Sequence, residues 1–220
     1  MTPAEFSQLA AQGYNRIPVV REVLADLDTP LSSYLKLAQG RYSYLFESVH
    51  GGEKWGRYSI IGLPARTVLK TYGPKITVET DGQVVESLQR DDALEFVEEF
   101  KARYKAAEVE GLPRFNGGLV GYFGYDCVRY VEPRLRGSTP EDTIGTPDIL
   151  LMVSDEVLVF DNLAGRLILV VQADPSAEGY PGALARLDEL EARLQLATPE
   201  TAPMKLAGES AREDEFKSSF

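Results

Sequence analysis

Alternating apolar and polar residues predict that much of this chain forms short β-strands. Successive side chains of a strand point to opposite faces of a sheet, so alternation indicates one buried face. Asp81-Gly82 separates two of these runs, and this dipeptide favours a two-residue hairpin turn. The predicted strands are Tyr42–Val49, Arg57–Gly62, Thr67–Tyr72, Lys75–Thr80, Gln83–Leu88, Ile149–Val153, Val157–Phe160 and Arg166–Gln172.

Apolar residues with a helical period predict helices between groups of strands. Thr29-Pro30 supplies a helix N-cap and a first helical residue, with Leu31, Tyr34, Leu35 and Ala38 on one face. Asp91-Asp92 begins a second helix, whose apolar face is Ala93, Leu94, Val97, Phe100 and Tyr104. Two further helices are predicted over residues 4–12 and 180–196. Because strands and helices do not alternate regularly, a parallel α/β sheet is not expected.

Composition and charge exclude several classes of protein. The formal net charge of -11 is spread along 220 residues without a basic run, which argues against binding nucleic acid or an anionic membrane surface. The apolar runs are too short to span a bilayer, and the N-terminus lacks the order of an export signal. One cysteine, Cys127, leaves no internal disulfide, and one histidine argues against zinc sites and imidazole-based triads. A cytoplasmic protein is expected.

Glu47-Ser48 is the strongest candidate for a binding site. The pair lies where the first predicted strand ends, before Gly51-Gly52. A carboxylate beside a hydroxyl is suited to the ammonium group of a free amino acid, provided that the strand ends or bulges there. The alternative is a polar pair on an edge strand that faces water.

Other conspicuous residues have structural explanations. Arg57 is flanked by aromatic residues on which a guanidinium commonly stacks, and His50 is expected to be a solvated loop residue. Glycines inside a strand usually permit close approach of backbone. That explanation suits Gly117, Gly118, Gly121 and Gly124. The acidic pairs Glu98-Glu99 and Glu141-Asp142 are expected to be solvated. No set of residues supplies a nucleophile, a base and an anion hole together, so no catalytic residue is assigned.

Several long segments resemble the amino-terminal half of anthranilate synthase component I. The resemblance covers nearly the whole chain, and its motifs are collinear. It rests on Asn15–Val20, Thr29–Leu37, Tyr44–Gly62, Gly117–Glu132 and Thr146–Asp161. The family fold is a duplicated α+β arrangement, in which antiparallel β-sheets pack face to face with helices outside.

The resemblance also implies a function. The complete enzyme converts chorismate to anthranilate and pyruvate, using Mg²⁺ and ammonia from a glutamine amidotransferase, component II. Its catalytic and metal-binding residues lie in the carboxyl-terminal half. The amino-terminal half binds the feedback inhibitor L-tryptophan through a Leu-Leu-Glu-Ser motif, which stands here as Leu45-Phe46-Glu47-Ser48. Glu47 and Ser48 are therefore implied to bind tryptophan, and Lys54, Arg57 or neither matches a basic residue found downstream in some members.

The resemblance divides the chain into three parts. Residues 1–196 are expected to form the regulatory domain, 197–209 a linker, and 210–220 the start of the chorismate-binding half. Two alternatives remain. One is aminodeoxychorismate synthase component I, a relative that makes a folate precursor. The other is a separate, non-catalytic amino-acid-binding module.

Overall fold

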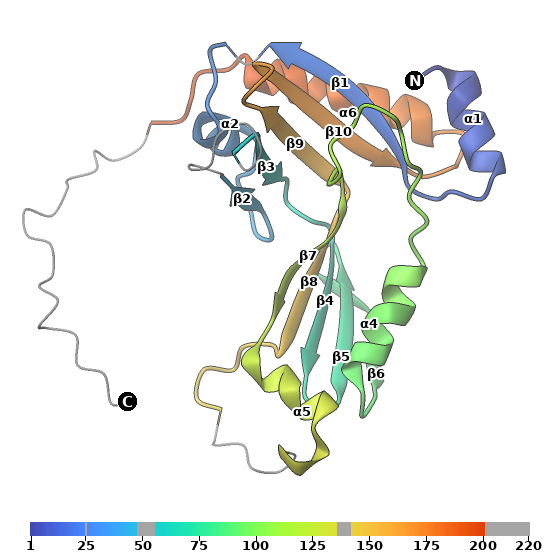
Figure 1. Ribbon diagram of the computed structural model, residues 1–220, viewed down its shortest axis with the longest axis vertical. Helices are drawn as coiled ribbons and strands as arrows, with labels where there is room; N and C mark the ends of the chain where they lie inside the picture. The colour runs from blue at the N-terminus through green and yellow to red at the C-terminus, as the bar shows by residue number, and fades with distance from the viewer. Residues whose placement is uncertain (25, 48–55, 136–141, 201–220) are drawn as a thin grey trace, which may run out of the picture.

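Two antiparallel sheets form the framework of the protein (Figure 1). The computed structural model describes residues 1–24, 26–47, 56–135 and 142–200. In spatial order the first sheet contains β1 (Ile17–Leu24), β10 (Arg166–Ala173), β9 (Glu156–Asp161), β3 (Tyr58–Gly62) and β2 (Tyr44–Phe46). The second contains β6 (Gln83–Gln89), β5 (Lys75–Thr80), β4 (Thr67–Tyr72), β8 (Ile149–Ser154) and β7 (Gly118–Phe123).

The chain passes from one sheet to the other between consecutive strands. β3 pairs with β9 in the first sheet, while β4 pairs with β8 in the second. Only Asp155 separates β8 from β9, so the chain turns a corner there and enters the other sheet. Side chains from both sheets meet at this corner in the corner cluster, which consists of Tyr44, Val68, Val120 and Met152.

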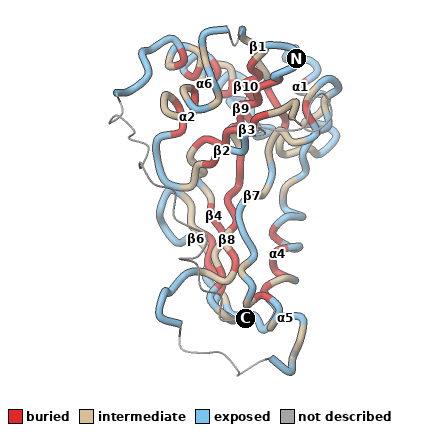
Figure 2. Tube along the Cα trace, turned by 60° about the vertical axis from the view of Figure 1, so that its left-hand side comes forward, coloured by how far each residue is buried: buried red, intermediate tan, exposed pale blue. Residues whose placement is uncertain are grey.

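Helices cover one face of each sheet. The first sheet packs against α1 (Pro3–Ala11), α2 (Pro30–Leu37) and α6 (Gly179–Leu194), and its core includes Leu158, Leu169, Leu187 and Leu190. The second packs against α4 (Ala93–Ala102), with Phe96 and Phe100 in its core. A short turn-rich segment follows β7: η1 (Tyr125–Cys127), α5 (Val128–Val131) and η2 (Pro133–Leu135). Buried residues accordingly follow β4, β8, β9 and β10 (Figure 2).

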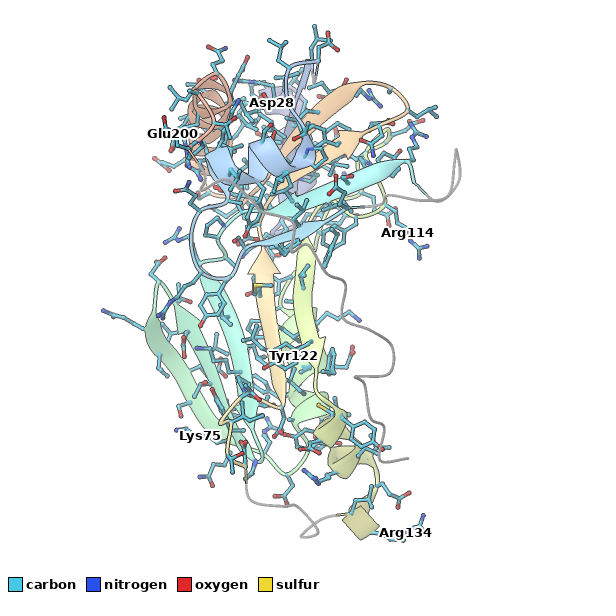
Figure 3. The ribbon with its side chains drawn as sticks, turned by 90° about the vertical axis from the view of Figure 1, so that its left-hand side faces the viewer. Asp28, Lys75, Arg114, Tyr122, Arg134 and Glu200 are labelled. Carbon is cyan, nitrogen blue, oxygen red and sulfur yellow. The ribbon has the colours of Figure 1, made fainter. Side chains whose placement is uncertain are left out.

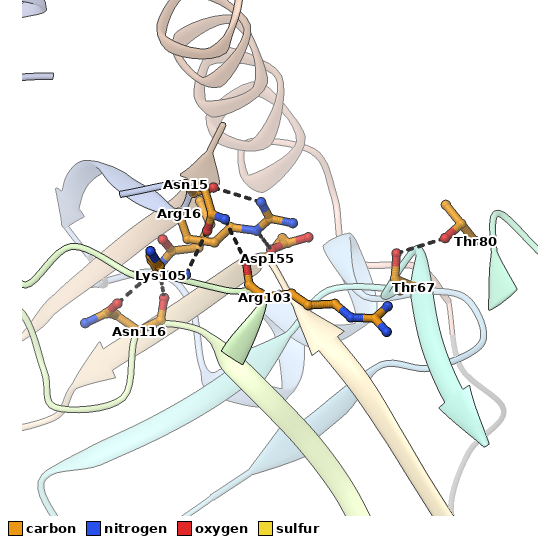
Figure 4. A network of polar contacts seen from close by, with 9 residues as sticks. Asn15, Arg16, Thr67, Thr80, Arg103, Lys105, Asn116 and Asp155 are labelled. Atoms are coloured by element: carbon orange, nitrogen blue, oxygen red, sulfur yellow. Dashed lines mark hydrogen bonds and ion pairs between the residues drawn. The ribbon is translucent and has the colours of Figure 1, made fainter. Parts of the chain in front are cut away.

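The connection from α4 to β7 crosses the face of the first sheet that lacks helices. Leu112 and Phe115 pack there on a cluster of four valine and isoleucine residues, Val157, Val159, Ile168 and Val170. Hydrogen bonds tie the same connection to the start of β1, where the side chain of Asn15 binds the backbone of Arg103 and Lys105 (Figure 4). The molecule is elongated, with Asp28 near one end and Arg134 at the other (Figure 3).

The predicted α+β class with antiparallel sheets and flanking helices is confirmed, and most elements lie where the pattern places them. Thr29 and Asp92 are helix N-caps, and Asp81 and Gly82 have φ values of 52° and 79° in the hairpin turn. Three details differ. The pattern does not predict β1, β2 has only three residues, and α2 buries Ser33 and Leu37 while Leu31 stays 50% exposed.

Gly121 in β7 provides a test of close backbone packing. A β-carbon at this position would overlap the carbonyl oxygen of Leu150 on the neighbouring strand. Gly121→Ala is therefore expected to lower the free energy of unfolding by about 1–3 kcal/mol, the usual range for overpacking. In α6, a β-carbon on Gly182 would meet no atom within 4 Å, so Gly182→Ala should raise the free energy of unfolding by about 0.5–1 kcal/mol. Urea unfolding of both variants checks the opposite signs.

Candidate functional site

Glu47 lies immediately beyond β2, the outermost strand on one side of the first sheet among the described residues. The last pair of the β2–β3 ladder is Phe46 with Ile60, and the side chain of Glu47 is exposed. Ser48 lies outside the described residues, as do His50, Gly51, Gly52, Lys54 and Trp55. The structure thus describes the strands before and after this segment, β2 and β3, and one of the two predicted ligand-binding residues, Glu47.

The two faces of β2 have different surroundings. Leu45 packs against the helix-covered core of the first sheet, whereas Tyr44 belongs to the corner cluster on the other side. Phe46 lies near Tyr44, with ring centroids 4.9 Å apart, and is 55% exposed. The replacement of leucine by phenylalanine in the motif therefore places an accessible aromatic ring on the Tyr44 side of β2, one residue before Glu47. This ring is suited to contact an apolar ligand.

Arg57, at the start of β3, is bound by an acid from a distant part of the chain. Its Nε and one terminal nitrogen donate to the two carboxylate oxygens of Asp161, at 3.0 and 2.7 Å. The guanidinium also stacks on Tyr58, 4.9 Å from the ring centroid, as the sequence predicted. Hydrogen bonds from Arg57 lower the pKa of Asp161, and the backbone N–H of Ala164 adds to this effect. Arg57 is therefore an ion-pair partner of Asp161, a role that no local pattern predicts.

Asn162 supports the same end of β3. Its backbone N–H donates to the carbonyl of Arg57 at 2.8 Å, and its side chain donates to the carbonyl of Gly56 at 3.3 Å. Residues 161 and 162 thus hold the beginning of β3 through both backbone and side chains. Sequence reasoning missed both residues, because partners about a hundred positions apart leave no local pattern.

The Arg57–Asp161 pair predicts a specific pH dependence. The pKa of Asp161 is lower in the folded chain than in the unfolded one, so its carboxylate stabilises the fold above the unfolded value. That contribution is lost as the pH falls through the folded value. Asp161→Asn should therefore lower the urea midpoint at pH 7. The difference in urea midpoint between the variant and the parent should shrink only below about pH 4, the ordinary pKa of an aspartate.

A matched control for this prediction exists where β4 begins and β5 ends. Arg66 and Asp81 form the same two-bond geometry, at 2.8 and 2.7 Å, but their side chains are 77% and 56% exposed. Exposed pairs contribute little to stability, so Asp81→Asn should lower the urea midpoint by less than Asp161→Asn does. Asp161 is only 1% exposed, so equal shifts for the two variants at pH 7 would show that its burial does not matter.

Most of the remaining candidates have the structural roles expected of them, but Glu141 lies outside the described residues, and Gly118 has no backbone in close approach. Gly121 and Gly124 lie against the backbone of Leu150 and Asp148, so their role in close approach is confirmed. Glu98 forms an exposed pair with Lys101, and Asp142 accepts from two backbone N–H groups of its own turn. Among the described residues, no three or more His, Cys, Asp or Glu side chains gather into a metal site, and no helix could cross a membrane.

Comparison with known proteins decides the family. A family model described as chorismate binding enzyme matches residues 43–220. The chain belongs to the family of chorismate-binding enzymes. Within this family it is similar to anthranilate synthase component 1 of Pseudomonas aeruginosa, at 58% identity over 221 aligned residues that cover 100% of the chain and 45% of the relative. The component 1 of Neisseria meningitidis serogroup B is 54% identical over 87% of the chain and 40% of the relative.

A solved structure agrees with these sequence comparisons. The crystal structure of anthranilate synthase component I from Streptococcus pneumoniae matches this chain with a TM-score of 0.53 and 28% identity. The match covers 80% of this chain and 37% of that one. The resemblance drawn from the sequence is therefore confirmed. The chain spans less than half the length of the relatives named here.

Proposed function

We propose that this chain functions as part of anthranilate synthase component I. With its glutamine amidotransferase partner, component II, the complete enzyme would convert chorismate to anthranilate and pyruvate in tryptophan biosynthesis. The observation that supports this most directly is the 58% identity to the Pseudomonas aeruginosa component 1 along the whole chain. Because the match covers 45% of that relative, the activity is proposed for a longer protein that contains this chain.

The regulatory role proposed for the chain is feedback inhibition by L-tryptophan. Glu47 would accept hydrogen bonds from the ammonium group, and the hydroxyl of Ser48 would bind the same polar end of the ligand. Burial of the indole ring would remove about 150–250 Å² from water, which is worth about 4–6 kcal/mol before the costs of binding. The ring of Phe46, one residue before Glu47 in the sequence, is exposed and offers an aromatic surface near the proposed site.

Residues 1–196 would form this regulatory domain, followed by a linker over 197–209 and the start of the chorismate-binding half over 210–220. No catalytic residue is assigned to the chain itself. Mg²⁺ is the metal that the family implies for the complete enzyme. The described residues contain no cluster that fits Mg²⁺, so no metal-dependent step is assigned to this chain.

Product analysis of the full-length protein, supplied with its amidotransferase partner, tests the proposed reaction. Chorismate should yield anthranilate and pyruvate, and L-tryptophan should inhibit the reaction. Formation of aminodeoxychorismate would instead favour the relative that makes a folate precursor.

Binding by the 220-residue chain alone tests the remaining alternative, a separate amino-acid-binding module. In the family, other walls of the tryptophan pocket come from the second half, so this chain should bind tryptophan weakly or not at all. Isothermal titration calorimetry of the chain is the measurement. Micromolar affinity would contradict the expectation and favour the module.

A further inference from the structure

We propose that Tyr44 is a positioning residue for the ligand-binding residue Glu47, and that Ser154 of the second sheet holds it in place. This inference rests on the proposed tryptophan site. Tyr44 is the first residue of β2, and Glu47 follows that strand directly. At about 3.3 Å per residue, the two residues are separated by about 10 Å of extended chain.

The ring of Tyr44 is fixed by its surroundings on two sides. It lies over Gly62, its partner in the β2–β3 register, where a β-carbon would overlap the ring. On the second sheet it packs with Val68, Val120 and Met152, and only 9% of the residue is exposed. Glycine at position 62 therefore creates the space that lets an aromatic side chain of the first sheet reach the second.

The hydroxyl of Tyr44 forms a hydrogen bond with the hydroxyl of Ser154. It lies 2.8 Å from the hydroxyl oxygen of Ser154, and Ser154 is 2% exposed. Burial raises the pKa of Tyr44 above its ordinary value, so the phenol keeps its proton at neutral pH. Each hydroxyl can donate or accept, and this bond satisfies two polar groups that would otherwise be buried without a partner.

The short length of β2 gives this one bond its importance. β2 is three residues long and lies at the edge of its sheet, where the described residues show pairing with β3 alone. The Tyr44–Ser154 bond attaches β2 to a strand of the other sheet, in addition to the packing of Leu45 on the helix-covered core and the Tyr34–Ser43 bond just before β2. Ser154 also ends β8 just before the corner at Asp155, so the position of Glu47 depends on how the two sheets meet.

The test uses the full-length protein with its amidotransferase partner. Tyr44→Phe keeps the ring but removes the hydroxyl, and Ser154→Ala removes the other partner. Each variant should raise the inhibition constant for tryptophan by about three- to tenfold, as expected for one hydrogen bond. The double variant should resemble either single variant, because both remove the same bond. Tyr180→Phe is the control, since its hydroxyl binds the carbonyl of Met1, away from β2.

The melting temperature, and kcat and KM for chorismate, are measured on the same samples. A merely structural role would lower the melting temperature of Tyr44→Phe and leave the inhibition constant unchanged, which would overturn the inference. If Tyr44→Phe does not fold, Ser154→Ala is judged by the same criterion. A parent protein that tryptophan does not inhibit would instead remove the proposed function, and this inference with it.

Discussion

In the full-length protein, Ser48→Phe is expected to raise the tryptophan concentration needed for half-inhibition by about 100-fold or more. The substitution removes a hydroxyl that would bind the charged end of the ligand, a contact worth about 1.5–3 kcal/mol. It also adds a ring to the space proposed for the ligand. Since each tenfold change in affinity corresponds to about 1.4 kcal/mol, the lost contact alone accounts for most of the effect. Inhibition of anthranilate formation measured against tryptophan concentration is the readout.

Ser87→Phe is the matched control for this experiment. Ser87 is an exposed residue of the edge strand β6, in the second sheet and away from β2. The same substitution there should leave the inhibition curve where the parent has it. If Ser48→Phe remained as sensitive to tryptophan as the parent, the assignment of Ser48 to the inhibitor site would be wrong.

Leu169→Ala is expected to lower the free energy of unfolding by about 2–5 kcal/mol, the range for removing a buried leucine side chain. Leu169 lies in β10, one of the inner strands of the first sheet, and is 0% exposed. Its replacement leaves a cavity in a core formed by strands and helices together, and a close-packed core collapses only partly around such a gap. Urea unfolding of the 220-residue chain, followed by circular dichroism, measures the loss.

The same substitution at an exposed leucine separates burial from any other property of alanine. Leu27 is 99% exposed, so Leu27→Ala should change the free energy of unfolding by less than about 0.5 kcal/mol. A comparable loss for both variants would show that Leu169 is not part of a packed core.

Some features escape sequence reasoning because the contacts that create them join distant residues. β1 is one of them, because its run from Ile17 to Leu24 contains Pro18 and adjacent charges, which weaken a strand pattern. Its pairing with β10 across the whole strand compensates for these residues. The predicted strand Tyr42–Val49 is longer than β2, because strand-like composition does not show where pairing with a neighbouring strand stops. The described ladder between β2 and β3 ends at Phe46, although the composition of the run is strand-like.

For the candidate site, the sequence alone led to the proposal of Glu47 and Ser48, through their chemistry and a family motif. It did not identify Tyr44, Ser154, Asp161 or Asn162 as the residues that support the neighbouring strands. These four lie in ordinary strand or turn sequence, and their roles appear only from contacts such as Tyr44–Ser154 and Arg57–Asp161.

Local sequence therefore determined the elements whose signals are local: the helix N-caps at Thr29 and Asp92, the Asp81-Gly82 turn, and the alternation of the strands. Backbone geometry and hydrogen bonding within a few residues are enough to specify these features. Tertiary structure decided how β8 and β9 divide at Asp155 into two sheets, and which side chains fix β2 and β3 around the candidate site. Those outcomes depend on packing between segments about a hundred residues apart, and no periodicity along the chain encodes such a contact.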